Sequence, residues 1–161
     1  MRIIAIISLV LALCAIGTSL RALEYDGHSF LLGSKHFGAN TDFNELNPGV
    51  FLRYTNDWIN VRPGVIYNSN EKFSPIVTFS SDLTTISVRD FNIATFGGVG
   101  YYHEEGKNSH ISIANTGWIP IAGIEITHDE YPIFVNIIPG DMSEKIEGDG
   151  YRLLISFGLS F

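Results

Sequence analysis

The sequence has a single cysteine, Cys14, among its 161 residues. One thiol can form neither an internal disulfide nor a cysteine-rich metal site, so neither stabilises this fold. Basic residues are also scarce, with 10 lysines and arginines against 17 aspartates and glutamates, and the formal charge is −7. Because nucleic-acid binding depends on cations that neutralise phosphates, we expect no nucleic-acid partner. A sustained apolar heptad is missing too, which excludes a coiled coil.

No apolar run in the sequence is long enough for a membrane-spanning helix. The longest runs from Ile3 to Ile16, about 14 residues, whereas a spanning helix needs roughly 20. A basic start precedes this run and small residues follow it, which is typical of a secretory signal peptide. We therefore expect a signal peptide over residues 1–22, cleaved after Ser19 or Ala22, and one exported domain over residues 23–161.

The rest of the chain lacks helical periodicity and alternates with the period of two that is typical of β-strands. Turn-forming clusters separate eight runs of β-branched, aromatic and glycine residues, near 28–37, 47–56, 58–69, 73–82, 88–103, 118–127, 131–138 and 150–160. These runs predict an all-β fold of eight antiparallel strands.

Three features favour a transmembrane β-barrel of the outer membrane over a secreted soluble β-sandwich. The last run ends on an aromatic residue, Phe161. The connections alternate between short (56–58, 83–87, 128–130) and long (38–46, 103–117, 139–149), as in bacterial outer-membrane barrels. Each run is also about ten residues, the length with which a tilted strand crosses a bilayer. We expect aromatic anchors at the periplasmic interface from Trp58, Tyr131 and Tyr151.

The inward face of such a barrel is not uniformly polar. Phe134, Ile138 and Leu154 alternate with the outward set. An eight-stranded barrel holds either packed side chains or one small ligand. The pattern therefore leaves two interpretations open, a filled structural core and an apolar slot for a hydrocarbon chain.

Polar residues that can support chemistry gather at the predicted outer rim. His36 ends the first strand, Asn68 and Ser69 end the third, and Glu45 lies just before the second. An imidazole that takes a hydroxyl proton, with a third group that orients it, is the arrangement used in acyl transfer. The rim is therefore the candidate active site.

Short motifs around these residues resemble the lipid A palmitoyltransferase (PagP) family. The resemblance spans most of residues 34–140 and rests on Ser34-Lys35-His36, Phe43-Asn44-Glu45 with Pro48-Gly49, Tyr67-Asn68-Ser69 with Lys72 and Pro75-Ile76, and Ile137-Ile138-Pro139-Gly140. It implies an outer-membrane barrel that moves an acyl chain from a glycerophospholipid to lipid A. Membrane lipids are then the partners, and we expect a monomer that uses no cofactor and no metal.

The resemblance also implies roles for single residues. His36 would transfer the proton and Ser69 would be the catalytic hydroxyl. Asn68 stands where the family has an aspartate, and an amide cannot stabilise an imidazolium by charge, so activity requires another acid or is weakened. Glu45 is the nearest candidate acid. Whether Ser69 becomes acylated or only polarises the ester stays open, and the sequence does not identify the oxyanion donors.

Other matching positions concern lipid entry and chain length. Pro48, Pro120 and Pro139 either end or bulge strands or, as the resemblance suggests, mark lateral openings for lipid chains. Ser80 stands where the family has a glycine at the floor of its acyl pocket, so we expect a chain shorter than palmitate.

Two other functions fit a small barrel. One is a non-enzymatic outer-membrane protein, adhesin-like or made for surface interactions, which the asparagine at position 68 and the serine at position 80 favour. The other is a lipid A deacylase, which would need a His-x-Ser pair on a late strand, and the sequence has none there.

Overall fold

The computed structural model describes residues 22–103, 113, 116–140 and 150–161, and strands make up most of them. In chain order the strands are β1 (Glu24–Phe37), β2 (Gly49–Thr55), β3 (Asn60–Tyr67), β4 (Phe73–Ser80), β5 (Ile86–Val88), β6 (Phe91–Tyr101), β7 (Trp118–His128), β8 (Ile133–Pro139) and β9 (Leu153–Ser160). One 3-10 turn, η1 (Asp82–Thr84), precedes β5. The all-β prediction is confirmed.

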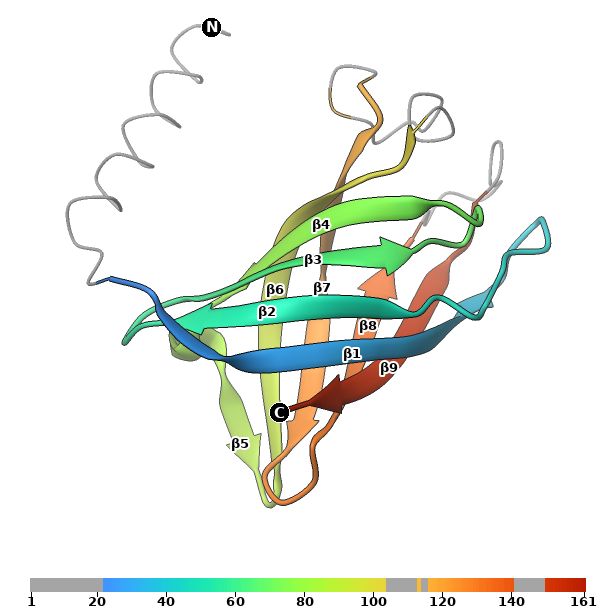
Figure 1. Ribbon diagram of the computed structural model, residues 1–161. Helices are drawn as coiled ribbons and strands as arrows, with labels where there is room; N and C mark the ends of the chain where they lie inside the picture. The colour runs from blue at the N-terminus through green and yellow to red at the C-terminus, as the bar shows by residue number, and fades with distance from the viewer. Residues whose placement is uncertain (1–21, 104–112, 114–115, 141–149) are drawn as a thin grey trace, which may run out of the picture.

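The strands form one sheet that closes on itself. Its order is β4-β3-β2-β1-β9-β8-β7-β6-β5, and an additional pairing between β4 and β6 completes the ring. All pairings are antiparallel, so eight strands make a closed barrel and β5 pairs only with β6, outside the ring (Figure 1). The predicted eight-stranded barrel is confirmed, and the two-layered sandwich is excluded.

One predicted strand was wrong. The strand predicted over residues 88–103 begins only at Phe91, as β6, and most of a separate strand, β5, lies in the connection predicted over 83–87; a tight turn at Arg89 and Asp90 joins the two. Arg89 takes a positive φ of 55°. This conformation usually selects glycine or asparagine, so an arginine there gives no turn signal in the sequence.

A close approach of two backbones allows the ring to close. A Cβ at Gly98 on β6 would lie 2.2 Å from the carbonyl oxygen of Val77 and 2.9 Å from the Cα of Thr78, both on β4. Gly98 pairs directly with Thr78 at this seam. Only a residue without a side chain fits there, which explains part of the glycine-rich stretch in β6.

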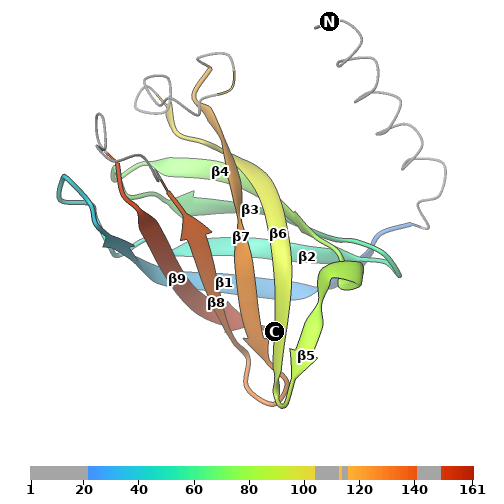
Figure 2. The ribbon, with the colours of Figure 1, turned by 180° about the vertical axis from the view of Figure 1, so that it is seen from behind.

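The two ends of the barrel differ in their connections (Figure 2). We call the end that carries residues 38–48 and 68–72 the loop end, and the other, with the β2–β3 and β7–β8 connections, the turn end. Trp58 and Tyr131 lie at the turn end, as predicted. Tyr151 does not: it packs against His36 at the loop end, because β9 runs back from the loop end to the turn end.

The distribution of polar and apolar residues is inverted relative to a water-soluble protein. In the described part of the chain, nine polar or charged residues are buried against three hydrophobic ones, Leu31, Ile66 and Phe134. Large apolar side chains face outward instead, among them Leu32 (43% exposed) and Phe157 (49%). The inside of the barrel is therefore lined mainly by polar side chains, with a few apolar ones in the middle, and its outer surface is apolar.

Several predictions fall outside the described residues. The signal peptide over residues 1–22 does so except for Ala22, and so do residues 104–112, 114–115 and 141–149 of the two longest connections. In the residues that are described, no helix has the length and apolar character needed to cross a membrane.

Candidate active site

His36 and Ser69 meet at the loop end. His36 lies near the end of β1 and Ser69 follows β3, and the His36 Nε2 and Ser69 Oγ atoms are 3.1 Å apart. The imidazole is 8% exposed. The ring of Phe43 stacks on it at 4.5 Å between centroids, and Tyr151 contacts it edge-on at 5.1 Å. The two residues predicted to share the rim therefore form a hydrogen-bonded pair with a fixed ring plane.

The second imidazole nitrogen has no hydrogen-bond partner among the residues that the structure describes. His36 Nδ1 is buried and forms no hydrogen bond with any described residue. In serine triads a carboxylate binds this atom, holds the tautomer and stabilises the imidazolium. The site is therefore a dyad in the described structure.

Asn68 does not supply the missing group, because its amide organises the turn after β3. Its Nδ2 donates to Ser74 Oγ at 2.7 Å, and its Oδ1 accepts from the backbone N–H groups of Asn70 and Lys72 at 2.9 and 3.0 Å. The side chain is 1% exposed and contacts these groups rather than His36. Its place in the structure is next to Ser69, which it helps to position.

Glu45 lies beside His36 but its carboxylate points elsewhere. It forms an exposed ion pair with Lys35, with Oε1 2.7 Å from Nζ. The hydrogen bond from Lys35 is the main reason that the pKa of Glu45 is lowered, and the backbone N–H of His36 adds to the shift. The Glu45 carbonyl oxygen accepts from Ser34 N at 2.9 Å, an approach that depends on Gly33 having no Cβ.

Asn47 is a site residue that the sequence did not reveal. It is 3% exposed, and its Nδ2 lies 3.4 Å from Ser69 Oγ. Ser34 Oγ donates to its Oδ1, and its Nδ2 donates to the carbonyl oxygen of Asn44 at 2.9 Å. An asparagine before a proline usually signals a turn, so the sequence pattern did not predict that the side chain of Asn47 is buried beside Ser69.

Two tyrosines border the dyad, Tyr151 against His36 and Tyr102 in the wall of the lumen. Burial raises the pKa of both hydroxyls, and their mutual repulsion raises that of Tyr102 further. Both hydroxyls are therefore neutral at physiological pH.

A cavity extends from Ser69 into the lumen. Its apolar lining consists of Leu31, Phe51, Ile66, Ile76, Phe96, Ile121, Phe134, Ile138 and Leu154. The predicted inward set, Phe134, Ile138 and Leu154, is therefore confirmed, and the lumen is not completely filled. One wall is polar, because Ser34, Ser156, Asn136 and Glu125 are consecutive partners across four strands and all line the cavity.

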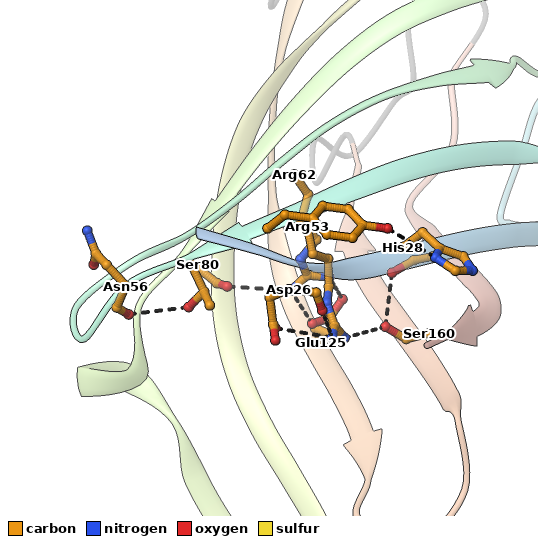
Figure 3. Close-up of polar contacts among 11 residues, drawn as sticks. Asp26, His28, Arg53, Asn56, Arg62, Ser80, Glu125 and Ser160 are labelled. Carbon is orange, nitrogen blue, oxygen red and sulfur yellow. Dashed lines mark hydrogen bonds and ion pairs between the residues drawn. The ribbon is translucent and has the colours of Figure 1, made fainter. Parts of the chain in front are cut away.

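An ion pair crosses the lumen toward the turn end (Figure 3). The two terminal guanidinium nitrogens of Arg62 on β3, Nη1 and Nη2, donate to the carboxylate of Glu125 on β7. The side chains are 17% and 7% exposed. Ser80, on β4, contacts Arg62 Nη2 at 3.4 Å and does not line the cavity. The floor of the cavity is therefore the ion pair, with Ser80 beside it.

The three prolines flank interruptions in the hydrogen-bond ladder. In the described residues, β7 and β8 pair only from Ile124 to Thr127, so the β7 segment that holds Pro120 has no ladder with β8, which ends at Pro139. Pro48 precedes β2, and beyond Leu31 strand β1 has no ladder with β2. The barrel wall is therefore weakest at the loop end.

No protein-family model matches the chain, and a search of curated proteins finds no match either. The closed eight-stranded antiparallel barrel is compatible with the fold that the resemblance implies, and neither comparison shows the family.

Proposed function

We propose that the protein is an outer-membrane acyltransferase of the lipid A palmitoyltransferase type, which moves an acyl chain from a glycerophospholipid to lipid A. The observation that carries the proposal is the hydrogen bond of 3.1 Å between His36 Nε2 and Ser69 Oγ at the mouth of an apolar cavity. It places a base and a hydroxyl where the ester of a lipid with its chain in the cavity would lie.

The location in the outer membrane is supported by the inverted surface. An apolar outer wall on a closed antiparallel barrel is what a bilayer requires, because closure of the ring leaves no open sheet edge in the hydrocarbon region. Phe79, Phe157 and Val65 are 42%, 49% and 48% exposed on this wall. The interrupted ladders beside Pro48, Pro120 and Pro139 would admit lipid chains from the side.

The chemistry follows from the dyad. His36 Nε2 accepts the proton of Ser69, whose oxygen attacks the ester carbonyl and becomes acylated, and the lysophospholipid leaves with that proton. A lipid A hydroxyl then attacks the acyl-Ser69 ester while His36 accepts its proton; the bond between the acyl carbon and Ser69 Oγ breaks, and Ser69 takes that proton back from His36. Because Nδ1 has no carboxylate partner among the described residues, we expect slower turnover than a complete triad would give.

The polar floor limits the donor chain. A methyl terminus cannot displace Arg62 and Glu125 without leaving buried charges unpaired, which is costly. The acyl chain must therefore fit between Ser69 and this ion pair, and we expect a chain shorter than palmitate.

The test is mass spectrometry of lipid A from Gram-negative cells with and without the protein. We expect one added acyl chain, which disappears in His36→Ala and in Ser69→Ala. Two matched controls at the turn end, His28→Ala on β1 and Ser87→Ala on β5, should keep the added mass. An unchanged lipid A, or an addition that survives His36→Ala, would reject the proposal.

A second candidate is a non-enzymatic surface-interaction barrel. The unpartnered Nδ1 of His36 and the engagement of Asn68 in its own turn favour it. In that case cell adhesion or serum survival would depend on the protein while lipid A stays unchanged, and His36→Ala would be silent.

A further inference from the structure

The side chain of Asn47 has a fixed orientation inside the loop end. A backbone carbonyl oxygen can only accept hydrogen bonds, so the Asn47 group 2.9 Å from the Asn44 oxygen must be the nitrogen, Nδ2. The other amide atom, Oδ1, accepts from the Ser34 hydroxyl. These two bonds hold the amide plane, and they leave one N–H of Nδ2 directed at Ser69 Oγ, 3.4 Å away.

The distance from Asn47 Nδ2 to Ser69 Oγ is long for a hydrogen bond, but the N–H group is well placed to bind the oxyanion that forms when Ser69 attacks an ester. When an ester carbonyl is attacked, negative charge develops on the carbonyl oxygen, which lies beside the attacking atom. Donors about 2.7–3.1 Å from that oxygen stabilise the charge. A donor slightly too far from the nucleophile itself is able to reach an oxygen bonded to the carbon under attack.

Among the described residues, two side-chain nitrogens lie within hydrogen-bond distance of Ser69 Oγ, namely His36 Nε2 and Asn47 Nδ2. The imidazole nitrogen has to accept the Ser69 proton, so it is not free to donate to the oxyanion. The amide nitrogen carries no proton that the reaction needs, and it is neutral and buried.

We propose that Asn47 Nδ2 is the oxyanion donor for the acyl transfer at Ser69. This rests on the proposed function. As the Ser69 Oγ–carbon bond forms and the proton passes to His36, the carbonyl electron pair moves onto its oxygen and the Asn47 N–H binds it. When the carbonyl re-forms, the bond to the lysophospholipid oxygen breaks and that oxygen takes the proton from His36. Ser34 is a positioning residue, because it acts through the amide.

The experiment measures kcat and KM of the purified chain in detergent micelles with phosphatidylethanolamine and lipid A. Asn47→Ala and the isosteric Asn47→Asp should both lower kcat about 10²–10³-fold and leave KM within about twofold, since a carboxylate accepts and does not donate. Asn92→Ala, a matched asparagine at the turn end, should leave both unchanged. Ser34→Ala should lower kcat by a smaller factor, about tenfold, at unchanged KM.

A second readout does not need transfer to occur. A long-chain alkyl fluorophosphonate phosphonylates Ser69 Oγ with loss of fluoride, and its phosphoryl oxygen occupies the oxyanion position. Asn47→Ala should slow this labelling at least tenfold, while Asn92→Ala should not. Equal labelling rates in the wild type and Asn47→Ala, or a raised KM at unchanged kcat, would overturn the role of Asn47. A wild type that is labelled at Ser69 but transfers nothing would instead overturn the acyltransferase function.

Discussion

The two ends of the lumen hold polar groups of different kinds. At the loop end, His36, Ser69 and Asn47 are neutral and joined by hydrogen bonds of 3.1 and 3.4 Å. At the turn end, charged side chains form ion pairs: Arg62 on β3 pairs with Glu125 on β7 across the lumen, and Arg53 on β2 pairs with Asp26 on the neighbouring β1 at 3.1 Å. Ser160 near the chain's last residue also accepts from Arg53, at 2.6 Å.

The charged groups at the turn end and the neutral groups at the loop end have different roles, the first in the stability of the barrel and the second in the reaction. A buried ion pair cannot lose one partner without exposing the other as an unpaired charge in a low dielectric, so it fixes the barrel's shape. Neutral groups exchange protons and partners at low cost. We therefore expect changes at the turn end to affect stability first, and changes at the loop end to affect transfer first.

The largest effect should come from breaking the ion pair. Glu125→Ala leaves Arg62 buried without a counter-charge, and we expect the free energy of unfolding to fall by about 3–5 kcal/mol. Denaturant unfolding of the refolded barrel in micelles, followed by circular dichroism, measures it. A loss below about 1 kcal/mol would mean that solvent reaches Arg62 freely.

The double variant Arg62→Leu with Glu125→Leu distinguishes the effect of an unpaired buried charge from the effect of the space that the side chains fill. It should recover most of the lost stability, because apolar replacements of a buried pair are often neutral or stabilising. It should also extend the apolar cavity toward the turn end and shift the transferred chain to a greater length, measured by mass spectrometry of the product. An unchanged chain length would show that the floor lies elsewhere.

An intermediate effect is expected in the wall between the two ends. Gly98→Ala places a methyl group against backbone atoms of β4, 2.2 Å from the Val77 oxygen, and should destabilise the barrel by about 1–3 kcal/mol. Gly97→Ala is the matched control, since its Cβ would meet only the Ile121 oxygen at 3.8 Å. Thermal unfolding of the two variants compares them directly, and equal midpoints would argue against a tight β4–β6 seam.

At the loop end, Ser69→Ala should cost little stability. It removes hydrogen bonds whose net contribution is about 0.5–1.5 kcal/mol each, while transfer is lost. The same denaturant titration and the lipid A assay measure the two quantities on one preparation. A loss of stability as large as that of Glu125→Ala would contradict the expectation that the loop end contributes mainly to transfer and the turn end mainly to stability.

The smallest effect concerns the exposed Lys35–Glu45 pair. The Lys35 hydrogen bond lowers the pKa of Glu45 in the folded protein. The pair therefore stabilises the folded state at pH values above the ordinary pKa of a glutamate, and this stabilisation is lost as the pH falls through the lowered pKa of Glu45. Unfolding midpoints of the wild type and Lys35→Met, taken between about pH 3 and pH 7, should converge at the acidic limit. A gap that widens with acid would contradict this sign.

Much of the fold was predictable because alternation and turn residues mark strands locally. The ends of β1 and β3 follow from chain direction alone, which brought His36 and Ser69 to one rim. Tyr151 was predicted at the wrong end because the direction of the last strand was misassigned. This strand runs from the loop end to the turn end, so the residue at its start lies at the loop end.

The remaining site residues depend on quantities that a sequence does not show. Arg62 and Glu125 are 63 positions apart, and they meet only because the tilt and register of the closed barrel bring β3 and β7 to the same depth. Asn47 follows a segment whose path needs a glycine at position 33, because a Cβ there would lie 2.9 Å from the Glu45 carbonyl oxygen. That His36 Nδ1 is buried without a hydrogen-bond partner in the described part of the chain is likewise a property of packing, which only the three-dimensional structure reveals.

The most direct test of the central claim uses a phospholipid whose acyl chain carries an isotope label, in vesicles that contain lipid A and the purified protein. We predict that the label appears in lipid A, and that omission of lipid A leaves it on Ser69, with neither product formed by His36→Ala. Label that reaches lipid A equally well without His36, or that never leaves the phospholipid in the presence of folded wild-type protein, would contradict the account.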